Sequence, residues 1–321
     1  NTIEIEETSE SITQEGLENS GAKLLRKGSF VLCRTGSIGA SAILEKEMAT
    51  DQSTVSFECI KNQSNPYYLN YVFSNCQSEL DRLGIGSTHP SIQLDFFPDL
   101  ELPTPPIEEQ RKIATVIYTV DRAIEHTEKI IEQTEKIGRG LRQSLFTDGY
   151  DVHETESYGT LGEVPKEWEK TRLHKIAKVE RGKFTHRPRN DPEFYNGEYP
   201  FIQTAEVVNS IGQLTDFNQS LNEKGREVSR EFDAGTIIIT IAGNIGDTAI
   251  ATFPVYFPDS LVGITPDEKI DERFLEQFLR YRQDFLNRLS TKTTQKNLNL
   301  TLLRPIEVVK PPLDEQEKIG D

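Results

Sequence analysis

The sequence predicts an α+β fold in which two similar modules, mostly β with helices near their ends, are joined by a long, coiled-coil-like α-helix. Three observations predict it: β-branched runs that end in glycine, a long apolar seam, and a set of motifs that occurs twice in the same order. The 321 residues suffice for two domains and a connector. We expect the later part of a first module over 1–104, the long helix over 105–147, a linker over 148–162, a second module over 163–310 and the start of a second long helix over 311–321.

The first module carries one strong strand signal and one helix signal. Its run GSFVLCRTG, from Gly28 to Gly36, is apolar, ends in glycine and indicates a buried strand. The segment NPYYLNYVFSNCQSELDRL begins at Asn65 and corresponds to an amphipathic helix in the second module. Strand and helix signals together predict the mixed character of the module.

The stretch from Ile107 to Phe146 predicts the long helix. Pro105 and Pro106 precede it, and Glu108 and Glu109 occupy its first turn, which is typical of a helix start. At 1.5 Å per residue the helix is about 60 Å long. Its other faces are charged, so it needs one partner helix, either in a dimerisation coiled coil or as a rigid spacer. Its seam follows the alternating steps of four and three residues of a coiled coil: Ile113, Ile117, Val120, Ile124, Thr127, Ile131, Thr134, Gly138, Leu141 and Leu145.

The linker and the second module follow the long helix. Residues Leu145 to Gly162 are polar and contain glycine, which indicates a linker. The run GTIIITIAG, from Gly235 to Gly243, predicts a buried strand, and ATFPVYF and RPIEVVKPP predict shorter ones. Apolar residues at helical spacing from Glu272 to Leu289 predict an amphipathic helix.

Three pairs of motifs indicate that the chain is a tandem repeat. RTGSIGASAI matches IAGNIGDTAI 207 positions later, and GSTHPSIQL matches KTTQKNLNL 206 positions later. PPIEEQRKIA likewise matches PPLDEQEKIG 206 positions later. Each copy is therefore a globular module followed by the start of a long helix. Because the first copy begins near the middle of the unit, we expect the chain to be a fragment that lacks the front of module one and most of the second helix.

Composition narrows the class of protein. No apolar run is long enough for a membrane span, and the N-terminus lacks the basic and apolar regions of a signal peptide. The three cysteines have no CxxC spacing and suit a reducing cytoplasm, and the five histidines have no metal-ligand spacing. No glycine-rich loop for ATP or a methyl-donor cofactor is recognisable. We therefore expect a cytoplasmic protein with no cofactor and no metal.

Positive charge is concentrated in two segments although the net charge is −16. Between Lys170 and Arg189 there are eight basic residues and one acidic residue, and between Arg273 and Arg304 there are seven and two. Both segments mix basic residues with the hydroxyl and amide groups that bond phosphates and base edges, which favours DNA binding over a merely solvated face. The candidate DNA-binding residues are Arg181, Lys183, Thr185, His186, Arg187, Arg189, Lys292, Thr294, Gln295 and Lys296 in module two, and Ser87, Thr88 and His89 in module one.

Two other functions compete with DNA recognition. Asp259, Asp267 and Lys269 formally satisfy the PD…(D/E)xK pattern of magnesium-dependent nucleases, although the spacing is short. The long helix alone is compatible with a non-catalytic coiled-coil adaptor.

The two GxxG elements, Gly36–Gly39 and Gly243–Gly246, could clamp a nucleic-acid backbone, but tight turns that need positive φ are the more common use of such elements.

The order of the motifs resembles the specificity subunit of type I restriction–modification systems. The resemblance rests on Pro105–Ala114 and Pro311–Ile319, with support from both GxIG turns and from Gly162–Trp168. It implies target recognition modules that each read half of a split DNA site, and two helices that pack antiparallel and fix the spacing. It also implies docking of methyltransferase (modification) subunits on those helices, recruitment of the motor-nuclease subunit, and no catalytic residue in this chain.

Overall fold

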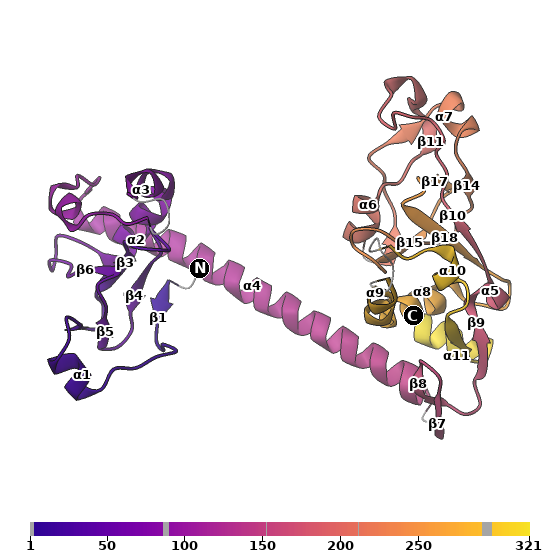
Figure 1. Cartoon of the computed structure of the whole chain (residues 1–321), viewed down its shortest axis with the longest axis horizontal. Helices are drawn as coiled ribbons and strands as arrows, with labels where there is room; N and C mark the ends of the chain where they lie inside the picture. The colour runs from indigo at the N-terminus through magenta and orange to yellow at the C-terminus, as the bar shows by residue number, and fades with distance from the viewer. Residues whose placement is uncertain (1–2, 86–89, 152, 211, 291–296) are drawn as a thin grey trace. The chain divides into compact units, whose positions relative to one another are not determined.

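The protein, represented by a computed structural model, is described over residues 3–85, 90–151, 153–210, 212–290 and 297–321. It divides into two compact units, unit 1 (Asn1–Ile131) and unit 2 (Glu132–Asp321). Helix α4 (Ile107–Asp148) begins in unit 1 and ends in unit 2 (Figure 1). Both units combine helices with a sheet, so the predicted α+β class and the predicted long connecting helix are confirmed.

Unit 1 is built on a four-stranded sheet in the order β1-β4-β3-β6. The first pair is parallel, and the other neighbours are antiparallel. A separate antiparallel pair is formed by β2 and β5. The strands of unit 1 are β1 (Glu4–Ile5), β2 (Lys23–Leu25), β3 (Phe30–Cys33), β4 (Ser41–Leu44), β5 (Met48–Thr50) and β6 (Thr54–Phe57).

The predicted strand of the first module is the centre of the core of unit 1. Phe30 and Leu32 point to one face of β3, where Phe73 stacks on Phe30 with ring centroids 5.4 Å apart. Val31 points to the other face and packs near Met48, as the alternation of a strand requires. The helices of unit 1 are α1 (Gln14–Glu18), α2 (Pro66–Asn75), α3 (Gln77–Leu83), the 3-10 helix η1 (Leu94–Asp99) and the first part of α4.

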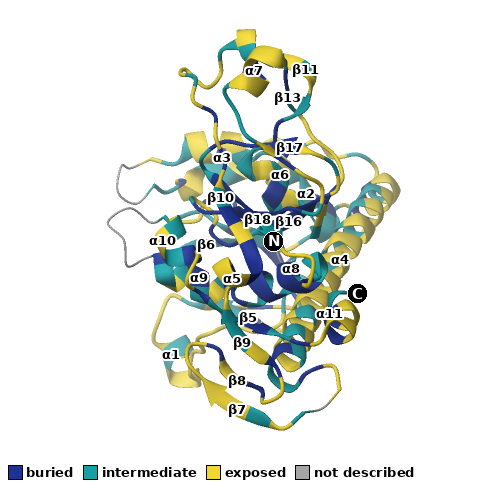
Figure 2. Cartoon of the chain, turned by 90° about the vertical axis from the view of Figure 1, so that its right-hand side faces the viewer, coloured by how far each residue is buried: buried dark blue, intermediate teal, exposed yellow. Residues whose placement is uncertain are grey.

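Unit 2 is built on a five-stranded sheet in the order β10-β18-β15-β16-β12. Its neighbours are antiparallel except for the parallel pair of β12 and β16. Figure 2 shows that these strands are largely buried, whereas most of α4 is exposed. The strands of this sheet are β10 (Ala177–Arg181), β12 (Gly212–Leu214), β15 (Ile237–Thr240), β16 (Thr248–Ala251) and β18 (Leu261–Pro266).

The sheet of unit 2 separates two hydrophobic cores. Ile237 and Ile239 face a large core that contains Phe146 at the end of α4. Ile238 faces a second core with Phe257. The β-branched run is thus buried on both faces. This explains why its isoleucines follow one another and do not alternate with polar residues. Besides the end of α4, the helices in the described part of unit 2 are α5 (Leu173–Ile176), α6 (Thr204–Asn209), α7 (Glu223–Glu227), α8 (Glu272–Tyr281), α9 (Gln283–Ser290), α10 (Leu300–Leu303), α11 (Leu313–Gly320) and the 3-10 helix η2 (Pro192–Phe194).

Four two-stranded pairs complete the described part of unit 2. One of them, the hairpin of β7 and β8, lies partly in the predicted linker, and Leu161 and Val164 bring it into the large core. This part of the polar segment is therefore packed against the module. The pairs are β7 (Thr155–Tyr158) with β8 (Gly162–Pro165), β9 (Glu169–Arg172) with β19 (Glu307–Lys310), β11 (Tyr195–Pro200) with β13 (Ser220–Leu221), and β14 (Glu231–Phe232) with β17 (Val255–Tyr256).

The two units repeat one fold. In each, a short strand runs parallel to the strand that follows the GxIG turn, β1 beside β4 and β12 beside β16. The GxIG elements are tight turns: Gly39 donates to the carbonyl of Cys33 at 2.9 Å, and Gly246 to that of Thr240 at 3.0 Å. Their glycines have φ between 74° and 86°, and at the first glycine of each turn there is open space for a side chain. Backbone conformation therefore accounts for glycine at these first positions.

Candidate DNA interface

Several loops of unit 2 emerge from one edge of the five-stranded sheet. Strands β10 and β15 end at this edge and β18 begins there, because Arg181 lies opposite Val262 and Thr240 lies opposite Leu261. The loop after β10, the GxIG turn after β15 and the segment before β18 are consequently neighbours. We call this edge, formed by residues 182–189, 241–247 and 257–260, the reading edge.

Backbone hydrogen bonds hold these loops together. The amide of Gly182 donates to Leu261 at 2.9 Å, and the amide of Ile241 donates to Ser260 at 3.4 Å. Asn297 forms an isolated bridge with Ala242, so the chain that follows residues 291–296 also reaches the reading edge. The candidates that fall within that segment lie outside the described residues: Lys292, Thr294, Gln295 and Lys296.

The other predicted residues of module two share the segment 181–189, which is the last residue of β10 together with the loop that follows it and is called here the loop 181–189. Phe184 anchors the loop because its side chain is buried and stacks on Tyr195, with ring centroids 5.8 Å apart. Thr185 is also fixed, since its amide donates to the carbonyl of Val228 at 3.0 Å. The structure therefore brings six candidates together on one anchored loop: Arg181, Lys183, Thr185, His186, Arg187 and Arg189.

One carboxylate lies among the arginines of this loop. Arg189 is hydrogen-bonded to the Asp259 carboxylate, and Arg187 Nη2 lies 3.8 Å from its second oxygen. Arg181 Nε donates to the Asp259 carbonyl at 2.5 Å. The side chains of Arg187, Arg189 and Asp259 are 52, 44 and 39% exposed, so water screens these ion pairs and they contribute little to stability. The guanidinium groups remain accessible to a phosphate or to a base edge.

His186 supports the loop through two contacts. Its ring stacks on Phe194 with centroids 3.9 Å apart, and its Nε2 lies 3.0 Å from Asp191 Oδ2. A hydrogen bond from the Glu193 amide, followed by the one from His186, lowers the pKa of the Asp191 carboxyl. Asp191 therefore stays ionised down to a lower pH than usual and orients the imidazole.

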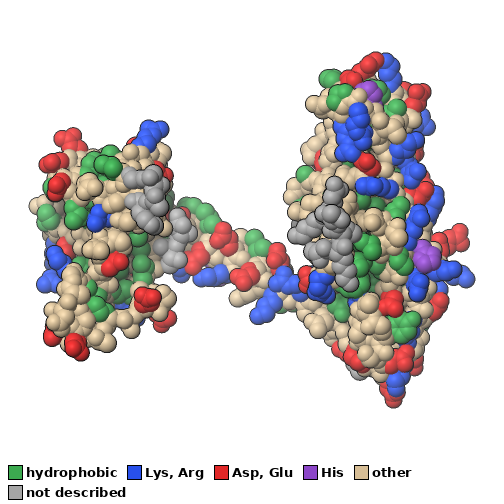
Figure 3. Space-filling model, in the orientation of Figure 1, with side chains coloured by type: hydrophobic (Ala, Val, Ile, Leu, Met, Phe, Trp, Pro, Cys, Tyr) green, Lys and Arg blue, Asp and Glu red, His purple; other side chains and the backbone are tan. Residues whose placement is uncertain are grey.

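The sequence did not single out two arginines that border the same loop. Arg230 Nη1 donates to the Arg181 carbonyl at 3.0 Å, and Arg226 lies over the ring of Tyr199 at 5.0 Å from its centroid. A bridge between Phe184 and Ser229 places the segment 226–230 beside the loop. Figure 3 shows Lys and Arg side chains distributed along the part of unit 2 that carries β10 and β11. No sequence signal links segments so far apart.

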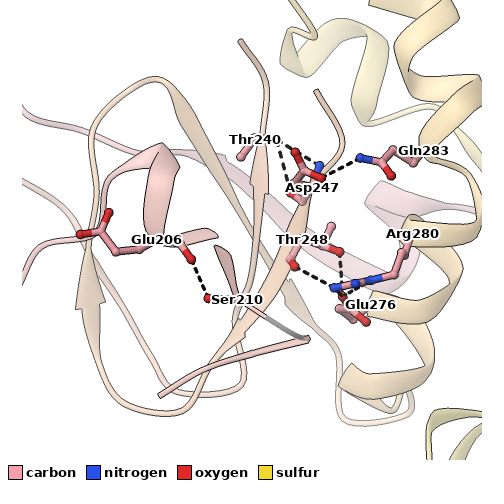
Figure 4. Close-up of polar contacts among 8 residues, drawn as sticks. All are labelled: Glu206, Ser210, Thr240, Asp247, Thr248, Glu276, Arg280 and Gln283. Atoms are coloured by element: carbon pink, nitrogen blue, oxygen red, sulfur yellow. Dashed lines mark hydrogen bonds and ion pairs between the residues drawn. The ribbon is translucent and has the colours of Figure 1, made fainter. Parts of the chain in front are cut away.

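A polar network fixes the GxIG turn of the reading edge (Figure 4). Thr240 Oγ1 accepts a bond from the Asp247 amide at 3.0 Å, and Gln283 of α9 donates to the Asp247 carboxylate at 2.8 Å. In unit 1 the equivalent Gln77 donates to the Ile38 carbonyl at 2.7 Å. Side chains of the module's own helix thus hold the turn in both units, which favours a scaffold role for the turn.

Unit 1 presents the corresponding edge. Arg34, which follows β3, donates through Nε to the Gln52 carbonyl at 3.0 Å and through Nη1 to Ser91 Oγ at 3.0 Å. Ser91 also forms a bridge with Thr35. The chain around the first-module candidates therefore meets the GxIG turn, as it does in unit 2. Those candidates lie outside the described residues: Ser87, Thr88 and His89.

The geometry does not support the nuclease alternative. Asp259 precedes β18 and Asp267 follows it, and six residues at about 3.3 Å each separate the backbones of these two residues by about 20 Å. A shared magnesium ion would require both carboxylates within direct coordination distance. The Asp259 carboxylate forms ion pairs with Arg187 and Arg189. The backbone carbonyl of Lys269 accepts a hydrogen bond from Gln316. The short spacing in sequence conceals the separation that an extended strand produces.

Comparison with known proteins identifies the family to which the repeat corresponds. The model of the type I restriction modification DNA specificity domain matches residues 1–136 and 165–321. The putative type I restriction enzyme MjaX specificity subunit of Methanocaldococcus jannaschii is 28% identical over 271 residues, which cover 81% of this chain and 61% of the relative. The MjaVIII specificity subunit of the same organism is 26% identical over 93% of this chain and 72% of its own length. The chain thus spans less than two thirds of the first of these relatives.

Solved structures support the fold. The S subunit of the type I restriction–modification system from M. genitalium aligns with a TM-score of 0.66 at 18% identity, covering 93% of this chain and 76% of that one. A chain from a structure of type I R-M complex assembly and conformational transition aligns with a TM-score of 0.52 at 16% identity, covering 93% and 73%. At these identities the likeness establishes the architecture of two modules and a long helix.

Proposed function

Because this chain belongs to the family of type I restriction modification DNA specificity domains, we propose that it is a sequence-specific DNA-binding subunit with no catalytic activity of its own. The observation that supports this most strongly is the anchored basic loop 181–189 at the reading edge of unit 2. The arginine guanidinium groups there can donate paired hydrogen bonds to phosphate oxygens or to the O6 and N7 acceptors of guanine. Phosphate contacts would supply affinity, and base contacts would supply sequence preference.

The repeat supports a bipartite DNA site. Both units carry a GxIG turn fixed by a helix side chain, with a second loop bridged to it, so both have the elements of a reading edge. Two DNA-binding modules of the same fold could each bind one of two half-sites that are separated by a spacer. Helix α4, which belongs to both units, is the spacer element in this proposal.

Helix α4 also supports a docking role. Apolar residues of its predicted seam are largely exposed, and they require a partner helix to be covered. We propose that this helical region docks the methyltransferase subunits, and through them the motor-nuclease subunit. No helix among the described residues is long and apolar enough to cross a membrane. A cytoplasmic location, where DNA is accessible and the cysteines remain free thiols, is part of the proposal. The exposed seam residues are Val120, Ile124, Ile131 and Leu141.

Selection from a random duplex library tests the function. We expect this chain to enrich two conserved half-sites separated by a spacer of constant length. In a salt titration on the enriched duplex, Lys183→Ala should weaken binding and reduce the salt slope by about one, because one phosphate contact is lost. Lys269→Ala, the same change at the opposite end of β18, is the control and should leave the slope unchanged.

Three outcomes would refute the proposal. Binding that is insensitive to salt and to Arg187→Ala would show that the loop 181–189 does not contact DNA. A chain that dimerises but binds no duplex at low salt would instead be a coiled-coil adaptor. Cleavage of plasmid DNA with magnesium by the wild type, but not by Asp267→Ala, would restore the nuclease alternative.

A further inference from the structure

Each unit contains a buried glutamine in the first turn of the helix that follows its module. Gln110 and Gln316 are both only 1% exposed, although they lie in first turns that otherwise face solvent on several sides. Gln110 belongs to α4 and Gln316 to α11. A burial this complete for an uncharged polar side chain requires that its amide be hydrogen-bonded within the protein.

The amide of Gln110 joins three points of the chain. Its Oε1 accepts from the Asn65 amide at 3.0 Å, and its Nε2 donates to the carbonyls of Gln63 at 2.9 Å and Pro105 at 2.8 Å. Asn65 is the N-cap of α2, where its side chain accepts from the Tyr68 amide. One side chain therefore ties the first turn of α4 to the start of the helix that packs on the sheet of unit 1.

Gln316 makes the same three bonds in unit 2. Its Oε1 accepts from the Asp271 amide at 3.0 Å, and its Nε2 donates to Pro311 at 2.8 Å and Lys269 at 3.3 Å. Asp271 is the N-cap of α8. All four residues lie 206 positions after their counterparts in unit 1. The arrangement occurs twice with matching donors and acceptors, so it is a property of the repeat.

The surrounding sequence explains why a side chain is needed at this junction. The helix is entered through two consecutive prolines, Pro105–Pro106 or Pro311–Pro312, which have no amide N–H to bond to the module. The glutamine amide supplies two donors and one acceptor at this place. With three bonds in different directions, it restrains both the position and the rotation of the first helical turn.

Small changes at this junction have large effects further along the helix. A tilt of about 10° at the base of a helix about 60 Å long moves its far end by about 10 Å, the length of about three base pairs. We propose that Gln110 and Gln316 are positioning residues that fix the directions in which α4 and α11 leave their modules. Through the direction of α4, Gln110 sets the spacing between half-sites that the chain accepts. The spacing part of this inference rests on the proposed function.

The first test compares spacing selectivity in Gln110→Met, which preserves side-chain length but removes the amide. In the duplex selection this variant should return the wild-type half-sites with a broadened distribution of spacer lengths. The preference for the wild-type spacer over one longer by a base pair should fall by about fivefold, as the loss of about one net hydrogen bond predicts. Lys112→Ala, an exposed neighbour in the same turn, should retain the wild-type preference.

Two results of the selection would overturn the inference. Unchanged spacing preference in Gln110→Met would show that the glutamine does not control the helix direction. Loss of the half-site sequences together with the spacing would show that it maintains the module fold instead. Gln316→Met removes the equivalent bonds at α11, which does not connect the two units, so it should leave the spacing preference unchanged and serves as a matched control.

A measurement without DNA separates this inference from the proposed function. Spin labels at the exposed positions Lys61 and Glu128, both in unit 1, report the angle between the module and α4 in the whole chain. Gln110→Met should broaden their distance distribution, and Lys112→Ala should not. An equally narrow distribution in both variants would overturn the positioning role, whether or not the wild type selects a bipartite site. The labels require serine in place of the free cysteines Cys33, Cys59 and Cys76.

Discussion

The same glutamate of the repeat has different environments in the two units. Glu315 is 5% exposed and accepts bonds from Trp168 Nε1 at 3.0 Å and from the Tyr150 amide at 3.1 Å, with His153 Nε2 at 3.0 Å. Glu109, its counterpart 206 positions earlier, is exposed in the described part of unit 1. The neighbouring glutamine is buried in both. Within one motif, therefore, the glutamine has a constant role, and the role of the glutamate depends on what packs beside it.

A second pair of equivalent sites differs in charge. In unit 1, Ser41 Oγ donates to the buried side chain of Asn70 at 2.9 Å. In unit 2 the corresponding Thr248 donates to Glu276 at 2.7 Å, and Arg280 bonds the same carboxylate oxygen at 2.7 Å (Figure 4). Unit 1 thus connects its helix to its sheet with a neutral pair, whereas unit 2 uses an ion pair. A buried charge makes unit 2 the more sensitive to loss of one partner.

The largest expected effect follows from that ion pair. Arg280→Met should destabilise unit 2 by about 3–5 kcal/mol, because the Glu276 carboxylate would stay buried without its cation. Ser74→Met, the equivalent change in unit 1, falls on an exposed position and should change stability by less than about 0.5 kcal/mol. Denaturant unfolding followed by the fluorescence of Trp168, the single tryptophan of the sequence, reports unit 2. A loss below about 1 kcal/mol in Arg280→Met would contradict the difference between the units.

An intermediate effect is expected from the two glutamates. Glu315→Ala should destabilise unit 2 by about 1–3 kcal/mol, because the Trp168 indole and the Tyr150 amide lose their acceptor. Glu109→Ala should have almost no effect on unit 1, since its side chain faces solvent. Circular dichroism during thermal unfolding, with Trp168 fluorescence recorded in parallel, compares the two variants. Equal losses of stability would mean that Glu109 also has a buried partner.

The sequence predicts well those features that are encoded locally. The repeat is visible because three motifs keep their order and spacing, and α4 is visible because its seam and its proline entry lie within one segment. The basic loop 181–189 is also local, and the structure keeps its residues together on one edge of the sheet. Its relation to DNA stays a prediction, as do the domain boundaries.

Features that depend on distant partners could not be predicted. The acceptors and donor that surround Gln110 lie up to 47 positions earlier, and no periodicity in sequence links them. Arg230 lies beside the loop because Phe184 forms a bridge with Ser229, 45 positions further on. Asp259 and Asp267 show the reverse case, since an extended strand separates residues that are close in sequence. Separation along the sequence is therefore a poor guide to separation in the structure, both for distant residues that meet and for near residues that are held apart.

The smallest expected effect concerns the carboxylate at the reading edge. Asp259 corresponds to Gln52, 207 positions earlier, and both residues accept an arginine Nε through their backbone carbonyl. Of these two residues, only Asp259 adds a negative charge among the arginines, and this charge opposes the binding of a phosphate backbone there.

Asp259→Asn should therefore raise the affinity for a duplex of unrelated sequence by about twofold to fivefold at low salt, the range expected for one exposed ion pair. Fluorescence anisotropy at two salt concentrations measures the change. Asp267→Asn removes the same charge at the opposite end of β18, so an equal rise in both variants would assign the effect to net charge and remove this distinction between the units.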